Sequence, residues 1–157
     1  QHRIAQLVVQ KLFGTVTGKR LAILGFAFKA DTNDTREAPA IRICGDLLEE
    51  GAQLAIHDPK VMPAQMARDL KQEAAEAADA LNGTGSWVLA QSVEEAVAGA
   101  DAVLILTEWR QYQQLNWQEL AARMRRPAWV FDARAVVNPE AVRAAGLTLW
   151  RVGDGEG

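Results

Sequence analysis

The chain has 157 residues, 49% hydrophobic and 24% charged, which fits one globular domain with its own core. Its net charge of −3 argues against a nucleic-acid partner, and its apolar runs are too short to span a membrane. Cys44 is the only cysteine, which excludes an internal disulfide and a thiolate metal site. No metal-ligand spacing occurs either, so we expect a cytoplasmic protein without a metal ion or a membrane partner.

The first half of the chain alternates helical and strand patterns. Apolar residues from Ile4 to Leu12 recur at helical spacing, which predicts a helix that Gly14 ends. The same approach predicts a strand over 21–24, a polar loop over 29–37, a helix through 41–48 and a strand over 54–56. An Ala-rich segment then predicts a helix over 64–81, followed by a loop over 82–85.

The second half continues the alternation. Strands are predicted over 87–89, 102–106, 128–131 and 147–151, and helices over 93–98, 117–124 and 139–145. Ser92 is expected to cap the helix that begins at Val93. We therefore predict a Rossmann-like α/β fold with a doubly wound, mostly parallel sheet in a three-layer αβα arrangement. Ligands of such sheets bind beyond the carboxyl ends of the strands.

The loop after the first predicted strand carries the most chemistry. A dinucleotide-binding turn needs Gly-x-Gly-x-x-Gly so that the backbone can approach a pyrophosphate, but here only Gly25 is present. An NAD site at this turn is therefore not expected. The loop instead offers two cations, Lys29 and Arg36, with hydroxyls, an amide and backbone N–H groups, which suits a phosphate-bearing ligand. A solvated capping loop with surface ion pairs is equally compatible with this composition.

Other candidate residues are weaker when each is taken alone. Asp58 follows the second strand, where an acidic ribose partner would lie, but an Asp-Pro turn is the favoured interpretation. Arg134 follows a later strand and could reach the same crevice, although an ordinary surface arginine is the simpler interpretation. Cys44 lies on an apolar helix face and is predicted to be a core residue, and His57 has no nucleophile pattern beside it.

Four motifs nevertheless resemble a known family over nearly the whole chain. They are Leu24-Gly25-Phe26-Ala27-Phe28-Lys29-x-Asp31-Thr32-x-Asp34-Thr35-Arg36-Glu37, Asp58-Pro59-Lys60-Val61, Leu106-Thr107-Glu108-Trp109 and Phe131-Asp132-x-Arg134. Together they closely resemble the C-terminal, UDP-sugar-binding domain of the UDP-glucose 6-dehydrogenases, which belong to the UDP-glucose/GDP-mannose dehydrogenase family. Residues 64–86 look like the longer, animal-type version of that domain.

The resemblance implies an activity and a set of site residues. Enzymes of this family oxidise UDP-glucose to UDP-glucuronate in two NAD-dependent steps through a thioester on a cysteine. The resemblance implies that Arg36 contacts NAD across an interdomain cleft. The substrate-binding positions that it implies are Phe28, Lys29, Ala30, Asp31, Thr32, Asn33, Asp34, Thr35 and Arg134.

The family's Gly-Gly-Ser-Cys-Phe nucleophile motif is absent, and Cys44 does not match it. The resemblance thus implies that no catalytic residue lies in this chain and that the chain alone is inactive. It makes residues 1–14 the end of a central linking helix, 15–153 the UDP-sugar-binding domain and 154–157 a frayed tail. The implied partners are a UDP-sugar and the other domains of a full-length enzyme, which would be a homo-oligomer.

Two alternatives stay open at this stage. A related GDP-mannose or UDP-N-acetylhexosamine dehydrogenase domain would share the architecture. A non-enzymatic dimerisation or interaction module would instead use the helix face that carries Ile4, Leu7 and Val8.

Overall fold

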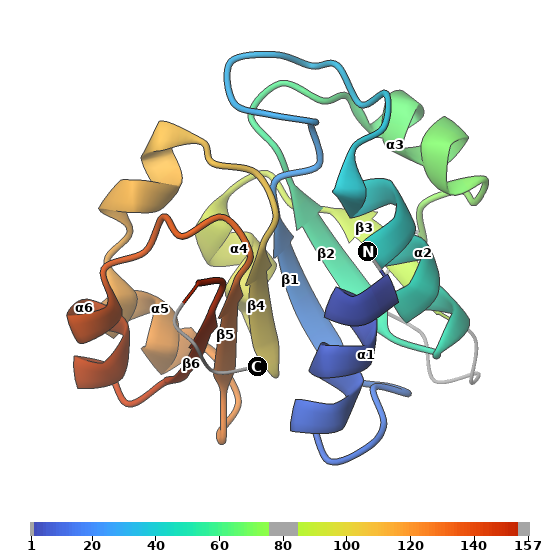
Figure 1. Cartoon of the computed structure of the whole chain (residues 1–157). Helices are drawn as coiled ribbons and strands as arrows, with labels where there is room; N and C mark the ends of the chain where they lie inside the picture. The colour runs from blue at the N-terminus through green and yellow to red at the C-terminus, as the bar shows by residue number, and fades with distance from the viewer. Residues whose placement is uncertain (1, 76–84, 154–157) are drawn as a thin grey trace.

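Six strands form one sheet between two layers of helices in the computed structural model, which describes residues 2–75 and 85–153 (Figure 1). The strands are β1 (Arg20–Leu24), β2 (Gln53–His57), β3 (Ser86–Leu89), β4 (Ala102–Ile105), β5 (Trp129–Asp132) and β6 (Thr148–Arg151). Their order is β3-β2-β1-β4-β5-β6, and each neighbouring pair is parallel. The predicted doubly wound, mostly parallel fold is therefore confirmed.

The helices divide between the two faces of the sheet. One layer holds α1 (His2–Lys11), α2 (Pro39–Glu49) and α3 (Pro63–Leu70), with α2 in contact with both neighbours. The other holds α4 (Val93–Val97), α5 (Trp117–Arg123) and α6 (Pro139–Ala144), and α5 contacts both α4 and α6. This division follows from right-handed crossovers, because the chain moves outward in opposite directions from β1 and from β4. Among the described residues no helix is long and apolar enough to cross a membrane.

The central strands are buried because their sequences are almost wholly apolar. In β1 the four residues from Leu21 to Leu24 are buried, and every residue of β4 is buried. Strands covered on both faces lose the usual alternation of apolar and polar residues, which is why these short runs could be recognised. Ser92 caps α4 as predicted, since its side chain accepts a hydrogen bond from Glu95 N.

The predicted helix over 64–81 is wrong over residues 71–75. Lys71 adopts a left-handed conformation (φ 56°), and residues 71–75 are not helical. This stretch turns back towards β3 instead, where Gln72 Nε2 donates to Gly85 O (2.9 Å) and Ala75 N donates to Trp87 O (2.8 Å). Tertiary hydrogen bonds have thus overridden local helix propensity. The rest of that prediction (76–81), most of the predicted loop (82–84) and the predicted tail (154–157) lie outside the described residues.

Two smaller differences concern the end of α1 and one additional short helix. Helix α1 ends at Lys11, before Gly14, because Phe13 and Gly14 both adopt positive φ angles. A short 3-10 helix, η1 (Arg110–Gln114), follows β4 and was not predicted.

Strand order reverses between β1 and β4, and this switch point is closed by the chain itself. Gly25 has φ 100°, and a Cβ atom at this position would lie 2.4 Å from Thr107 Cβ. Thr107 Oγ1 also donates a hydrogen bond to Ala27 O (2.8 Å). In Figure 1 the strands end at the top, and the loops after β1 and β2 rise above the sheet there. The space available to a ligand is therefore further out, on these loops.

We predict that Gly25→Ala destabilises the fold by about 2–4 kcal/mol, since it adds backbone strain and a steric clash. The matched control is Gly45→Ala in α2, where a Cβ atom would meet nothing within 4 Å. The control should instead stabilise by about 0.5–1 kcal/mol through helix propensity. Urea unfolding of both variants checks the prediction, and equal stabilities would contradict it.

Candidate functional site

The base of the loop after β1 is fixed by the carboxylate of Asp58, which follows β2. Asp58 is 9% exposed and accepts hydrogen bonds from two segments of backbone and from one indole. The donors are Phe26 N (2.7 Å), Ala27 N (3.0 Å), Lys60 N (2.8 Å), Val61 N (3.0 Å) and Trp109 Nε1 (3.2 Å). The acidic side chain is thus a structural acceptor, in line with the Asp-Pro turn interpretation.

The N–H groups of this turn are consequently not available to a dinucleotide. In a Rossmann turn they would face the pyrophosphate, but here Phe26 N and Ala27 N face Asp58. Further along the loop, Phe28 N donates to Asp34 O (2.8 Å), and Arg36 N donates to Asp34 Oδ1 (2.9 Å). The loop satisfies much of its own backbone, whereas the sequence had suggested that these groups were free.

The tip of the loop is the exposed part. Lys29, Asp31 and Asn33 are exposed, and the apolar side chain of Phe28 is 44% exposed. Asp31 adopts a left-handed conformation (φ 67°), which is uncommon outside glycine and often marks functional loops. Among the described residues Lys29 forms no ion pair, so its charge faces solvent.

The far side of the loop is held by α3. Thr35 is only 4% exposed, and its hydroxyl donates to Asp69 Oδ2 (2.6 Å). Gln65 Nε2 donates to both Thr35 Oγ1 and Asn33 O, each at 2.9 Å. The hydroxyl of Thr35 is therefore used as donor and acceptor within the chain. Gln65 and Asp69 were missed in the sequence, because nothing in an Ala-rich helix pointed to the loop.

Arg36 is turned towards Asp34 rather than left free. Its Nε donates to Asp34 Oδ1 (3.0 Å) and its Nη2 donates to Asp34 Oδ2 (2.9 Å), which is a two-pronged arrangement. The hydrogen bonds from Arg36 lower the pKa of Asp34 from 3.8 to about 2. The Arg36 side chain is nevertheless 88% exposed, so this surface ion pair can open at little cost to a competing anion.

Arg134 and Glu108 meet at the same edge of the sheet. Glu108 follows β4 and Arg134 follows the neighbouring β5, and Arg134 Nη2 lies 2.8 Å from Glu108 Oε1. The turn that carries Arg134 is anchored by the fully buried Asp132, which accepts hydrogen bonds from Arg134 N and Val137 N. Because β1 lies beside β4, the loops with Lys29, Glu108 and Arg134 leave three adjacent strands at the same end.

The remaining sequence candidates have structural roles. Cys44 is fully buried, as predicted for a core residue, and burial raises the pKa of its thiol. His57 is 6% exposed and its Nδ1 lies 2.9 Å from Tyr112 Oη, while burial lowers the pKa of the imidazole. The described residues contain no group of three potential metal ligands.

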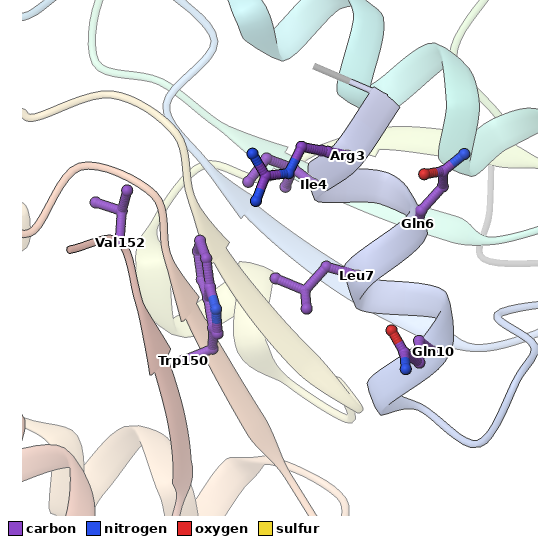
Figure 2. Close-up of a pocket in the computed structure, with 7 residues that line it drawn as sticks. All are labelled: Arg3, Ile4, Gln6, Leu7, Gln10, Trp150 and Val152. Carbon is purple, nitrogen blue, oxygen red and sulfur yellow. The ribbon is translucent and has the colours of Figure 1, made fainter. Parts of the chain in front are cut away.

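A hollow lies between α1 and the end of β6. Figure 2 shows Ile4, Leu7 and Gln10 on α1 opposite Trp150 and Val152. The helix face suggested for an interaction module is partly used by the fold itself, since Val8 is fully buried while Ile4 and Leu7 are half-buried.

Comparison with known families gives a specific match. The model of the UDP binding domain of the UDP-glucose/GDP-mannose dehydrogenase family matches residues 22–139. The chain is 41% identical to UDP-glucose 6-dehydrogenase 5 of Oryza sativa subsp. japonica, over 96% of this chain and 33% of that protein. It is 37% identical to the UDP-glucose 6-dehydrogenase of Caenorhabditis elegans, over 98% of this chain and 31% of that protein. The chain thus spans about a third of the length of these relatives.

Solved structures share the fold. A UDP-glucose dehydrogenase from Pyrobaculum islandicum is 26% identical, with a TM-score of 0.62 over 94% of this chain and 28% of that one. A UDP-D-ManNAc dehydrogenase from Pyrococcus horikoshii is 23% identical, with a TM-score of 0.70 over 99% of this chain and 30% of that one. At that identity the second likeness supports the fold alone.

We predict that Asp58→Asn lowers the free energy of unfolding by about 2–4 kcal/mol, because the new amide group would face N–H donors that then lack an acceptor. The control is Asp31→Asn at the exposed loop tip, for which a change within about 0.5 kcal/mol is expected. Urea unfolding measures both, and a neutral Asp58→Asn would show that the carboxylate is dispensable.

We predict that Asp34 titrates well below the ordinary pKa of an aspartate. Its folded pKa lies below the ordinary value of 3.8, so its pairing adds stability above that pH, and this stability is lost as the pH falls through about 2. Carboxyl NMR should give a midpoint near pH 2 in the unaltered chain and a higher midpoint in Arg36→Ala, which loses the guanidinium but keeps the backbone N–H donor at position 36. Equal midpoints in the two proteins would refute the pairing in solution.

Proposed function

This chain belongs to the UDP-glucose/GDP-mannose dehydrogenase family, and we propose that it binds the UDP part of a sugar nucleotide at the carboxyl edge of its sheet. The observation that carries the proposal is the loop over 28–35. Its base is fixed by Asp58 and its side by α3, while its tip presents Phe28 and Lys29 to solvent. The match to the family's UDP binding domain supports this assignment.

The side chains at this edge suit a diphosphate that carries an organic group. Lys29 supplies an ammonium group without an ion-pair partner among the described residues, and it can donate to a phosphate oxygen. Arg134 supplies a guanidinium group that Glu108 already orients at 2.8 Å. The half-exposed ring of Phe28 offers an apolar surface beside these charges. We propose that the remaining tip residues, from Ala30 to Thr35, contact the ligand mainly through their backbone.

In the longer protein we propose that this binding positions the sugar for oxidation of UDP-glucose to UDP-glucuronate. Binding energy from the UDP part can hold the sugar C6 at a reacting centre elsewhere, which raises the rate through orientation. The reactive cysteine would lie in another part of the enzyme, because Cys44 is fully buried.

NAD does not fit the turn after β1 as a resident ligand of this domain. Asp58 holds the N–H groups of Phe26 and Ala27, and Thr107 occupies the space beside Gly25. We propose that NAD is held by the rest of the longer protein, and that the exposed guanidinium of Arg36 reaches it from across a cleft. We also propose a cytoplasmic homo-oligomer for the full-length enzyme.

A related dehydrogenase for GDP-mannose or a UDP-N-acetylhexosamine is the second candidate. The relatives that are 37–41% identical are named UDP-glucose 6-dehydrogenases, which favours UDP-glucose. Calorimetric titration of this chain with UDP-glucose, UDP-N-acetylglucosamine and GDP-mannose would separate the candidates.

We predict that Lys29→Ala raises the Kd for UDP-glucose about tenfold, because a charge-assisted hydrogen bond contributes roughly 1.5–3 kcal/mol. Isothermal titration calorimetry on the 157-residue chain measures this. The matched control is Lys19→Ala, a partly exposed lysine directly before β1 at the opposite end of the sheet, which should leave the Kd unchanged. An unchanged Kd for Lys29→Ala would remove Lys29 from the site.

A further inference from the structure

Helix α3 presents two polar side chains to the loop that follows β1. Gln65 and Asp69 are four residues apart, so they lie on the same face of the helix. The neighbouring Met66 is fully buried and fixes this helix against the core. Both polar side chains therefore face the loop from a rigid support.

Their contacts converge on one side chain of the loop. Asp69 accepts the Thr35 hydroxyl at 2.6 Å, and Gln65 Nε2 donates to that same hydroxyl and to Asn33 O. Asp69 is 17% exposed, so water competes only weakly for this short hydrogen bond. Thr35 thus acts as the anchor of the loop rather than as a free ligand-binding hydroxyl.

We propose that Gln65 and Asp69 are positioning residues for the nucleotide-sugar site, acting through Thr35 and Asn33 on the exposed tip of the loop. This inference rests on the proposed function of the loop. With the anchor in place, the backbone from Phe28 to Asp34 is held in one conformation before the ligand arrives. Without it, the loop must be ordered by the ligand itself, and binding weakens.

The experiment measures UDP-glucose affinity and loop order in the same variants of the full chain. Asp69→Ala should raise the Kd about fivefold or more, and Asp69→Asn, which keeps an acceptor oxygen, should restore most of the affinity. Gln65→Ala is the milder second variant and should act in the same direction. Amide hydrogen exchange over residues 28–34 should accelerate in Asp69→Ala even without ligand.

Asp46→Ala is the matched control for a lost aspartate hydrogen bond on a helix. Asp46 lies on α2, its side chain is 23% exposed, and its Oδ2 lies 2.6 Å from His2 Nδ1. Its removal should change neither the Kd nor the exchange of the loop. If Asp69 acts through Thr35, then combining Asp69→Ala with Thr35→Val should weaken binding no more than Thr35→Val alone, because Thr35→Val already removes the hydroxyl that Asp69 contacts.

The outcomes separate this inference from the proposed function. If Lys29→Ala weakens binding while Asp69→Ala and Gln65→Ala bind like the unaltered chain, the positioning role is refuted and the proposed function stands. Affinity losses that Asp69→Asn does not rescue, with unchanged loop exchange, would also refute it. If the unaltered chain fails to bind UDP-glucose, the proposed function fails and this inference fails with it.

Discussion

The carboxylate of Asp58 is the interaction on which the ligand edge depends. A buried carboxylate loses its hydration, and here five N–H donors replace the lost water. Two of these donors, Phe26 N and Ala27 N, belong to the turn that in a dinucleotide-binding domain would face a phosphate. The Asp58 carboxylate thus accepts the hydrogen bonds that a ligand phosphate would accept in a dinucleotide-binding domain. The fold keeps its Rossmann-like topology, and the site that we propose lies further out, at the loop tip.

Electrostatics at this edge rely on arrangement rather than on an excess of positive charge. Arg36 is paired with Asp34, Arg134 is paired with Glu108, and Lys29 alone of these cations has no described ion pair. A loop with balanced charges attracts anions only weakly from a distance, in keeping with a chain of net charge −3. Selectivity must then come from donors held at fixed positions. In the proposed site Glu108 serves this purpose by orienting the Arg134 guanidinium before a ligand binds.

The sequence predicted the sheet well because strands that are buried on both faces are continuous apolar runs. The apolar runs of β1 and β4 could be recognised as strands without knowing which strands they pair with. The local Asp-Pro turn at Asp58 was predicted, but its bonds to Phe26, Ala27 and Trp109 could not be, because these donors lie far from Asp58 in the sequence. The same holds for Thr35, which the family resemblance placed at the ligand while the structure directs its hydroxyl to Asp69. The helix predicted over residues 71–75 failed because propensity is local, whereas the turn back to β3 depends on long-range hydrogen bonds.

One continuous segment, residues 58–69, supports the loop at two points. At its start Asp58 fixes the base of the loop, and near the end of α3 Asp69 fixes its side. Because Lys60 N and Val61 N also bind Asp58, the segment between the two anchors is itself constrained. A loop tied twice to the same rigid segment loses little further entropy when it binds a ligand. The exposed side chains at the tip, Phe28 and Lys29 among them, are then the groups that can adjust to a nucleotide in the proposed site.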